Sequence, residues 1–346
     1  MYQGFYNLKD NPFRLTPDPA FMCMTSQHQE ALSGLIYSVC TRPGLAVLMG
    51  EAGTGKTTLL YALLGLLEKR RFVTALCTNP TLTRQEFYDI LMIKFGVECE
   101  SSLKSRQLMA LEARVRQYRA EGRPAVLIVD EAQRLSLELL EEIRLLLNLE
   151  TANEKLLQII VAGQPELGEV LRRPELRQLK QRVSCICKLQ PLTRTELREY
   201  LHHRITRAGL PTQSLFSEET IESIYNYTQG IPRLINSLCD SALQTGFALQ
   251  SPKITIAIIE EAARDLDLAQ QIEAEEPAAP VNQLARVAAS TVGSAVLPPK
   301  PVASNGVSPN GRNGNHVKPE IRIPLDSYAS RQKSLGFFGS LMERWK

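Results

Sequence analysis

Strong charge of one sign, long apolar runs and a paired cysteine framework are all missing from this 346-residue sequence. Forty lysines and arginines against 37 aspartates and glutamates leave a formal net charge of +3, which argues neither for nor against a nucleic-acid partner. The longest apolar stretch, residues 59–67, is far shorter than the ~20 residues that span a bilayer. The amino terminus has no basic region followed by a long apolar run, so we expect no secretory signal.

Cysteine usage indicates a reducing compartment. The seven cysteines are odd in number and scattered through apolar segments, which does not fit a disulfide framework. Cys185 and Cys187 stand two apart and would share one face of a strand. Because no second cysteine pair or nearby histidine completes a metal cage, we expect them to pack in the core. We therefore expect a cytoplasmic protein.

What the sequence does contain is a glycine-rich loop between a short apolar run and a helix. Its glycines let successive N–H groups face one anion, and the helix expected from Lys56 directs its positive end at the same point. The spacing fits a P-loop, or Walker A motif, in which Lys56 reaches the β- and γ-phosphates and Thr57 takes a Mg²⁺ position. The predicted nucleotide-binding residues are Gly50, Glu51, Ala52, Gly53, Thr54, Gly55, Lys56, Thr57 and Thr58.

An acidic pair forms the second constellation. The apolar run 125–129 fits a strand buried on both faces, and Asp130 and Glu131 follow it directly. We expect Asp130 to hold Mg²⁺ through its water shell and Glu131 to polarise the water that attacks the γ-phosphate of ATP, as in a Walker B motif. Taken alone, such a pair is also compatible with a solvated turn or a helix cap.

The order of elements predicts the fold class. Strands alternating with helices up to about residue 190 predict a parallel α/β sheet covered by helices on both faces, a P-loop NTPase. Helices alone follow, so residues 191–270 are predicted to form a small all-helical lid. Residues 271–333, rich in Ala, Pro, Ser, Asn and Gly, are predicted to be a disordered linker. Residues 334–346 are predicted to form a short amphipathic helix.

Several dispersed motifs resemble AAA+ ATPases of the ExeA/GspA type, which are associated with general secretion and similar envelope-assembly systems. The resemblance covers residues 1 to about 270. The segments that carry it are residues 5–13, 16–19, 28–32, 130–133, 162–167, 176–183 and 230–236. It implies an ATP hydrolase that works as a homo-oligomer with a protein partner in a secretion, pilus or polysaccharide-export system.

The resemblance also implies roles for three further residues. Gln164 would be the sensor 1 residue, at the end of its strand, and Arg233 would be sensor 2, reaching from the lid. Arg182 would be the arginine finger, which enters the neighbouring subunit's site. For each a simpler role stays open: a turn-capping amide for Gln164, a helix cap or surface ion pair for Arg233, and a solvated basic face for Arg182.

The resemblance places residues 11–32 beside the adenine pocket. Phe13 would either contact the base or pack in the core, and His28 is not a candidate metal ligand. Adjacent histidines, His202 and His203, are equally unpromising as a metal site.

Many ExeA/GspA proteins continue through a transmembrane helix into a peptidoglycan-binding domain, and we expect neither here. Residues 334–346 instead offer a tethered docking element for an inner-membrane surface or a partner groove, or a tail without a role. A DNA-associated AAA+ regulator, related to transposition or origin-recognition ATPases, is the alternative function. It is less favoured because no winged helix or helix-turn-helix unit is recognisable and the basic residues form no long stripe.

Overall fold

The computed structural model describes residues 2–41, 44–78, 81–210 and 215–268. These residues belong to the first of the two units into which the chain divides, residues 1–274. The predicted linker, 271–333, and the predicted amphipathic helix, 334–346, lie outside the described residues.

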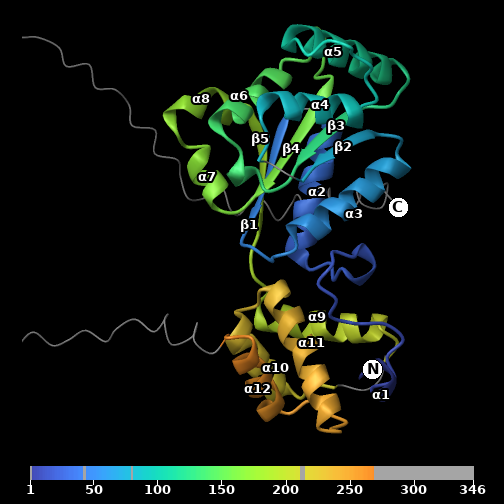
Figure 1. The fold of residues 1–346 in the computed structure, drawn as a ribbon, viewed down its shortest axis with the longest axis vertical. Coiled ribbons are helices and arrows are strands. Elements are labelled where there is room, and N and C mark those ends of the chain that lie inside the picture. Colours follow the sequence, from blue (N-terminus) through green and yellow to red (C-terminus); the bar gives the residue numbers. More distant parts are fainter. Residues whose placement is uncertain (1, 42–43, 79–80, 211–214, 269–346) are drawn as a thin grey trace, which may run out of the picture. The chain divides into compact units, whose positions relative to one another are not determined.

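A parallel sheet organises the amino-terminal part of the described chain (Figure 1). Its spatial order is β2-β3-β4-β1-β5, and every neighbouring pair is parallel. The strands are β1 (Leu45–Gly50), β2 (Val73–Cys77), β3 (Ala125–Val129), β4 (Leu157–Gly163) and β5 (Val183–Leu189). Because the strands are parallel, the loops that follow β1, β3 and β4 meet at one edge of the sheet.

Helices cover both faces of this sheet, as alternating strands and helices predict. One face packs on α4, α5 and α6, where Leu127 and Ile159 of the sheet join Phe87, Leu111 and Leu140 in one apolar cluster. Helices α2 and α3 contact the sheet from the other side. The helices are α1 (Tyr2–Phe5), α2 (Ser26–Thr41), α3 (Lys56–Lys69), α4 (Arg84–Lys94), α5 (Lys104–Ala120), α6 (Leu137–Leu146), α7 (Glu166–Val170) and α8 (Arg177–Lys180). Three short 3₁₀ turns are η1 (Pro19–Phe21), η2 (Ala132–Arg134) and η3 (Pro174–Leu176).

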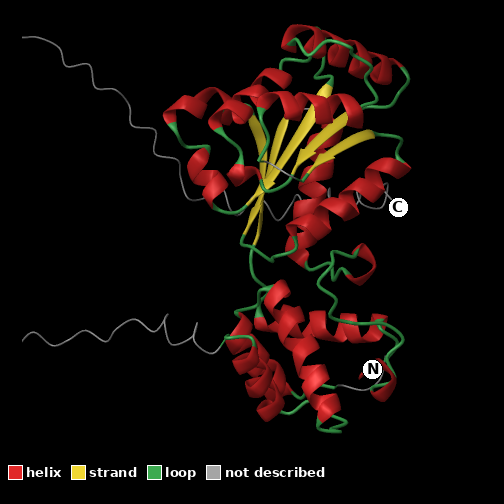
Figure 2. Cartoon of the chain, viewed as in Figure 1, coloured by secondary structure: helices red, strands yellow, loops and turns green. Residues whose placement is uncertain are grey.

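Four helices, which we call the helical region, follow β5, and Figure 2 shows them joined by loops. They are α9 (Arg194–Arg207), α10 (Glu218–Thr228), α11 (Pro232–Ala248) and α12 (Ile256–Asp265). A capping box starts α9, because the Thr193 side chain accepts from the Glu196 N–H and the Glu196 side chain accepts from the Thr193 N–H. This cap, just after Pro191, marks where strands give way to helices.

A second apolar cluster fills the helical region, and the first residues of the chain belong to it. Tyr6, Leu8, Phe13 and Phe21 are buried there among side chains of α9 to α12. The backbone N–H of Lys9 also donates to the Ala208 carbonyl at 2.7 Å. The amino-terminal segment therefore packs on helices about 200 residues later in the chain, a pairing that local sequence patterns do not predict.

The predicted elements agree with the structure to within a few residues. The strand expected over 125–129 is β3, for example, and the helix expected from Lys56 is α3. Among the described residues, no helix is both long and apolar enough to cross a membrane.

Candidate functional site

The glycine-rich loop joins β1 to α3, as its motif requires. No side chain caps the start of α3, so the N–H groups of its first turn keep no side-chain partner there. Thr54 tightens the loop by donating its hydroxyl to the Glu51 carbonyl at 2.9 Å. The open N–H groups and the positive end of the helix dipole make this turn suited to binding phosphate.

Lys56 is folded into the loop. Its buried ammonium donates to the carbonyl oxygens of Gly50 and Glu51, at 2.8 and 2.9 Å. Burial lowers the pKa of this ammonium, and the nearby carboxylates of Glu131 and Asp130 oppose that lowering. Lys56 is thus a cation in a confined space that faces two acidic side chains.

Thr57 and Asp130 bring the two sequence motifs into direct contact. The Thr57 hydroxyl donates to Asp130 Oδ2 at 2.7 Å, although the two residues are 73 positions apart in sequence. Asp130 is 3% exposed, and its own N–H donates to the Cys77 carbonyl. A hydroxyl and a carboxylate oxygen side by side are hard oxygen ligands, so this pair fits a magnesium ion.

Glu131 lies beside Asp130 and lines the same cavity as the loop. Its backbone is left-handed, with φ of 55°, and its N–H donates to Asp130 Oδ1 at 2.9 Å. Its carboxylate accepts a hydrogen bond from Gln133 Nε2 at 2.7 Å. Gln133 Oε1 in turn accepts from the backbone N–H of Gln164, at the end of β4.

Arg233 approaches the loop from the first turn of α11. Its backbone N–H donates to the Gly53 carbonyl at 3.2 Å. A side chain at Gly53 would place a Cβ 2.7 Å from Arg233 Cβ, and Gly53 has φ of +84°, so this contact requires glycine. The helical region therefore contacts the glycine-rich loop, residues 50–58, directly, and we call this segment the phosphate loop from here on.

These groups surround a cavity of about 530 Å³, which suits a nucleotide-sized ligand. Its lining combines the loop with Glu131, Gln164 and Arg233, and with residues of the amino-terminal segment and of α9 and α11. Residues 14–18 and 21–23 come from the amino-terminal segment, Tyr200 and Arg204 from α9, and Pro232 and Asn236 from α11, and α2 adds His28. Asp130 and Gln133 are not lining residues, but each is hydrogen-bonded to one, Asp130 to Thr57 and Gln133 to Glu131.

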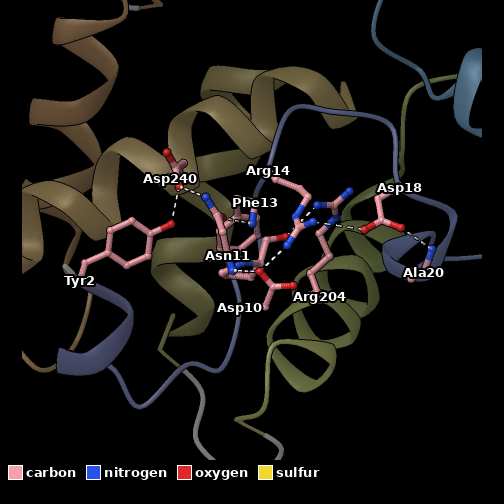
Figure 3. A network of polar contacts seen from close by, with 10 residues as sticks. Tyr2, Asp10, Asn11, Phe13, Arg14, Asp18, Ala20, Arg204 and Asp240 are labelled. Carbon is pink, nitrogen blue, oxygen red and sulfur yellow. Dashed lines mark hydrogen bonds and ion pairs between the residues drawn. The ribbon is translucent and has the colours of Figure 1, made fainter.

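A network of hydrogen bonds joins the amino-terminal segment to the helical region (Figure 3). Tyr2 and Asn11 both donate to Asp240 Oδ1, the first at 2.5 Å and the second at 3.1 Å. The buried Arg204 donates to the Pro12 carbonyl at 2.7 Å, and its guanidinium lies over the Tyr200 ring. The hydrogen bonds of this network therefore hold the amino-terminal segment against α9, which supplies Tyr200 and Arg204 to the cavity, and against α11.

Much of the segment 11–32, which the resemblance places beside the adenine pocket, lines the cavity, and of the two roles left open for Phe13 the structure has packing. Phe13 is fully buried against Phe216 and does not line the cavity, because its ring completes the second apolar cluster. Phe21 reaches the cavity instead, with the Arg14 guanidinium 5.3 Å from its ring centre.

His28 connects the start of α2 to the phosphate loop. Its Nδ1 is 2.7 Å from the Thr25 hydroxyl, and its Nε2 lies 3.5 Å from the position that a Cβ on Gly55 would occupy. Burial lowers the pKa of His28, while a hydrogen bond to the Thr54 backbone and the charge of Glu196 raise it. From the sequence, His28 was expected only not to bind a metal, within the segment 11–32 that the resemblance places beside the adenine pocket.

Arg182 is the one predicted site residue that lies elsewhere. Its Nη1 donates to the Leu147 carbonyl at 3.4 Å, next to Lys155, in a separate cavity of about 410 Å³. Arg182 therefore cannot serve the phosphate loop of its own chain in this arrangement.

Cys185 and Cys187 lie on one face of β5, as predicted, with their sulfurs 3.6 Å apart against Gly34 of α2. Cys187 is buried and Cys185 is half-buried. Within the described part of the chain, no group of three or more His, Cys, Asp or Glu side chains could hold a metal.

Sequence reasoning missed Gln133, Tyr200 and Arg204. Gln133 could have been identified from the sequence, because it lies two positions after Glu131 within the segment 130–133, which carries part of the family resemblance. Tyr200 and Arg204 had none, since nothing local says that α9 faces a loop some 150 residues earlier in the chain.

Comparisons with known proteins agree with this geometry. Residues 40–171 match a family model described as an AAA domain. General secretion pathway protein A from Aeromonas hydrophila is 38% identical over 270 residues, which cover 77% of this chain and 48% of that protein. The chain thus spans about half the length of this relative.

Solved structures share the fold at low identity. Cdc6p from Pyrobaculum aerophilum has a TM-score of 0.57 at 15% identity, over 76% of this chain and 70% of that one. A chain in the structure of Drosophila ORC bound to DNA also reaches 0.57 at 15% identity, over 79% and 67%. Likeness at this identity concerns the fold alone, and with the AAA-domain match it confirms the predicted P-loop NTPase fold.

Proposed function

We propose that this chain, which belongs to the AAA+ ATPases of the general secretion pathway protein A type, binds and hydrolyses ATP with Mg²⁺. The observation that carries the proposal is the meeting of the loop with Asp130, Glu131 and Gln164 at one edge of the sheet. Strand order explains it, because β4 lies between β3 and β1. The helical region supplies Arg233 to the same cavity.

Each residue then has a role that its surroundings support. The N–H groups at the start of α3 and the Lys56 ammonium bind the phosphates. Thr57 and Asp130 would hold Mg²⁺, which supplies positive charge against the developing negative charge of the phosphoryl group.

Hydrolysis itself falls to the remaining polar groups. Glu131 accepts a hydrogen bond from the attacking water and orients it toward the γ-phosphate. Gln164, as sensor 1, hydrogen-bonds the γ-phosphate or that water. Arg233, as sensor 2, links the presence of phosphate to the position of the helical region, because its backbone already contacts Gly53.

A comparison of two carboxylate variants tests hydrolysis. We expect Glu131→Gln to lower phosphate release at least about a hundredfold while binding of a fluorescent ATP analogue persists, because only the attacking water loses its partner. Glu166→Gln is the matched control, since this exposed carboxylate lies near Lys56 but outside the cavity lining. Equal phosphate release from wild type and Glu131→Gln would refute the proposal.

We further propose that the protein works as a homo-oligomeric motor or switch on a protein partner in an envelope-assembly system, at the cytoplasmic face of the inner membrane. The name of its Aeromonas relative supports the secretion setting. Sizing with and without ATP tests the oligomer. Co-purification with envelope proteins encoded beside the gene tests the partner.

The DNA-associated alternative rests on fold likeness to origin-recognition proteins, which at 15% identity supports the fold alone. Salt-dependent binding to duplex DNA at moderate ionic strength would favour it over the envelope role.

A further inference from the structure

A single amide, that of Gln133, links the proposed base Glu131 to the strand end that carries the proposed sensor Gln164. Gln133 Nε2 lies 2.7 Å from Glu131 Oε2, and its Oε1 lies 3.1 Å from the Gln164 backbone nitrogen. Both ends of the side-chain amide are therefore engaged. The link spans the tip of β3 and the tip of β4.

Chemistry fixes the orientation of this amide. A backbone N–H can only donate, so the carbonyl oxygen of Gln133 must face Gln164. The ionised carboxylate of Glu131 can only accept, so the NH₂ group must face Glu131. The two requirements agree, and a reversed amide would lose both hydrogen bonds.

The backbone around Gln133 is shaped for this contact. A Cβ on Gly163 would lie 2.7 Å from Gln133 Oε1 and 3.2 Å from Gln133 N. The absence of a side chain at the end of β4 therefore leaves room for the Gln133 amide. Glu131 holds a left-handed backbone conformation, with φ of 55°, which few non-glycine residues adopt. The fully buried Ala132 anchors the intervening turn.

The bond to Glu131 is of the stronger kind, because its acceptor is charged. It holds Oε2 and leaves Oε1 without a hydrogen bond to Gln133, on a side chain that lines the cavity. An exposed glutamate would instead sample several rotamers, and misplacing a catalytic group by about 1 Å can lower a rate a hundredfold.

We propose that Gln133 is a positioning residue, which holds the Glu131 carboxylate in a fixed relation to Gln164 so that the water-orienting group and the sensor act together. This inference rests on the proposed ATP hydrolysis and deepens it. Gln133 touches neither nucleotide nor water in this account and acts only through Glu131 and Gln164.

Two substitutions separate the two hydrogen bonds. Gln133→Met keeps the length of the side chain and removes both bonds. Gln133→Glu keeps an acceptor toward the Gln164 N–H but removes the donor and places a second negative charge against Glu131. We expect each to lower kcat about tenfold or more, with the KM for ATP changed less than about twofold, because phosphate binding is untouched. Arg134→Met, on the next and exposed position, is the matched control.

A double-variant comparison excludes a merely structural role. In single-turnover assays over hours, adding Gln133→Met to Glu131→Gln is expected to change the residual rate less than about twofold, because the carboxylate that it positions is already gone. If Gln133→Met folds poorly, Gly163→Ala can be used instead, because its new Cβ would displace the Gln133 amide without a change at position 133. We expect a similar drop in kcat.

The outcomes are distinct. If wild type hydrolyses ATP and both Gln133 variants keep the wild-type kcat, the positioning role is overturned and the proposed function stands. An equal fall in both backgrounds, or a fall in kcat only for Gln133→Met, overturns it in favour of a structural role at the β4 end. If wild type hydrolyses no ATP, the proposed function fails and the positioning role fails with it.

Discussion

The backbone N–H of Arg233 donates a hydrogen bond to the carbonyl oxygen of Gly53, and this bond joins the helical region to the phosphate loop. The two residues are 180 positions apart in sequence. Because of this contact, the conformation of the loop depends on the position of α11. A phosphate bound at the loop would therefore affect the position of α11 as well.

Gly53→Ala is expected to weaken ATP binding about tenfold. Its new Cβ would lie 2.7 Å from Arg233 Cβ and in a backbone conformation of φ +84°, a strain of roughly 1–2 kcal/mol. Titration of a fluorescent ATP analogue measures the change. Gly65→Ala in α3 is the control, because a Cβ there meets nothing within 4 Å and alanine favours a helix. A wild-type affinity for Gly53→Ala would show that the loop does not need this close approach.

Glu142→Ala is expected to lower the free energy of unfolding by about 2–3 kcal/mol. The buried Glu142 carboxylate accepts from Tyr88 at 2.9 Å and from Lys104 at 2.7 Å, and so ties α6 to α4 and α5. Its loss leaves the buried Tyr88 hydroxyl without this acceptor. Urea unfolding measures the effect.

Glu141→Ala is the control for Glu142→Ala, because the Glu141 carboxylate is exposed and forms an ion pair with Arg144 at the surface. A surface pair of this kind contributes less than about 1 kcal/mol. Equal losses for Glu141→Ala and Glu142→Ala would show that the buried network contributes nothing special.

Stability is expected to fall on acidification through His28. Burial holds the pKa of folded His28 below its unfolded value of 6.5, so the unfolded state binds a proton first as the pH falls. The stabilisation is fully present above pH 6.5 and decreases below it, by at most about 1.4 kcal/mol per pH unit.

Urea unfolding of wild type and His28→Asn between pH 7.5 and 5.5 tests this. We expect the variant to lose less free energy of unfolding over that range than wild type. Thr25→Val removes the Nδ1 partner but keeps the histidine, and so should retain the pH dependence. Identical slopes for wild type and His28→Asn would contradict the prediction.

Arg182→Ala is expected to abolish ATP hydrolysis in the assembled oligomer while each chain still binds ATP, because Arg182 lies away from its own cavity. Arg177→Ala on α8 is the control. An equal mixture of Arg182→Ala and Glu131→Gln chains should regain about a quarter of the activity, since one interface in four pairs an intact Glu131 with an intact Arg182. A mixture without activity, or an unaffected Arg182→Ala, would remove the arginine-finger role.

Local patterns in the sequence predicted the fold well. Alternating apolar runs and amphipathic segments place five strands and most helices within a few residues, because burial on a sheet and helical spacing leave period-specific traces. The phosphate loop could also be recognised from the sequence, because its glycines, Lys56 and Thr57 are close together in the chain and form one motif.

Residues whose function depends on distant partners were harder to identify. Phe13 could have faced the nucleotide or the core, and only its packing on Phe216 decided between them. Gln133 lies in the segment 130–133, which carries part of the family resemblance, but no role could be predicted for it because its partner Gln164 follows another strand.

The sequence by itself determined which groups could bind phosphate and Mg²⁺, and that strands and helices alternate before a helical region. Tertiary structure decided which of them meet. The order β2-β3-β4-β1-β5 brings Thr57 to Asp130 and places Gln164 between the acidic pair and the loop. The physical reason is that strand order depends on long-range packing of whole faces, which no window of neighbouring residues encodes, whereas loop chemistry and periodicity are written in adjacent positions.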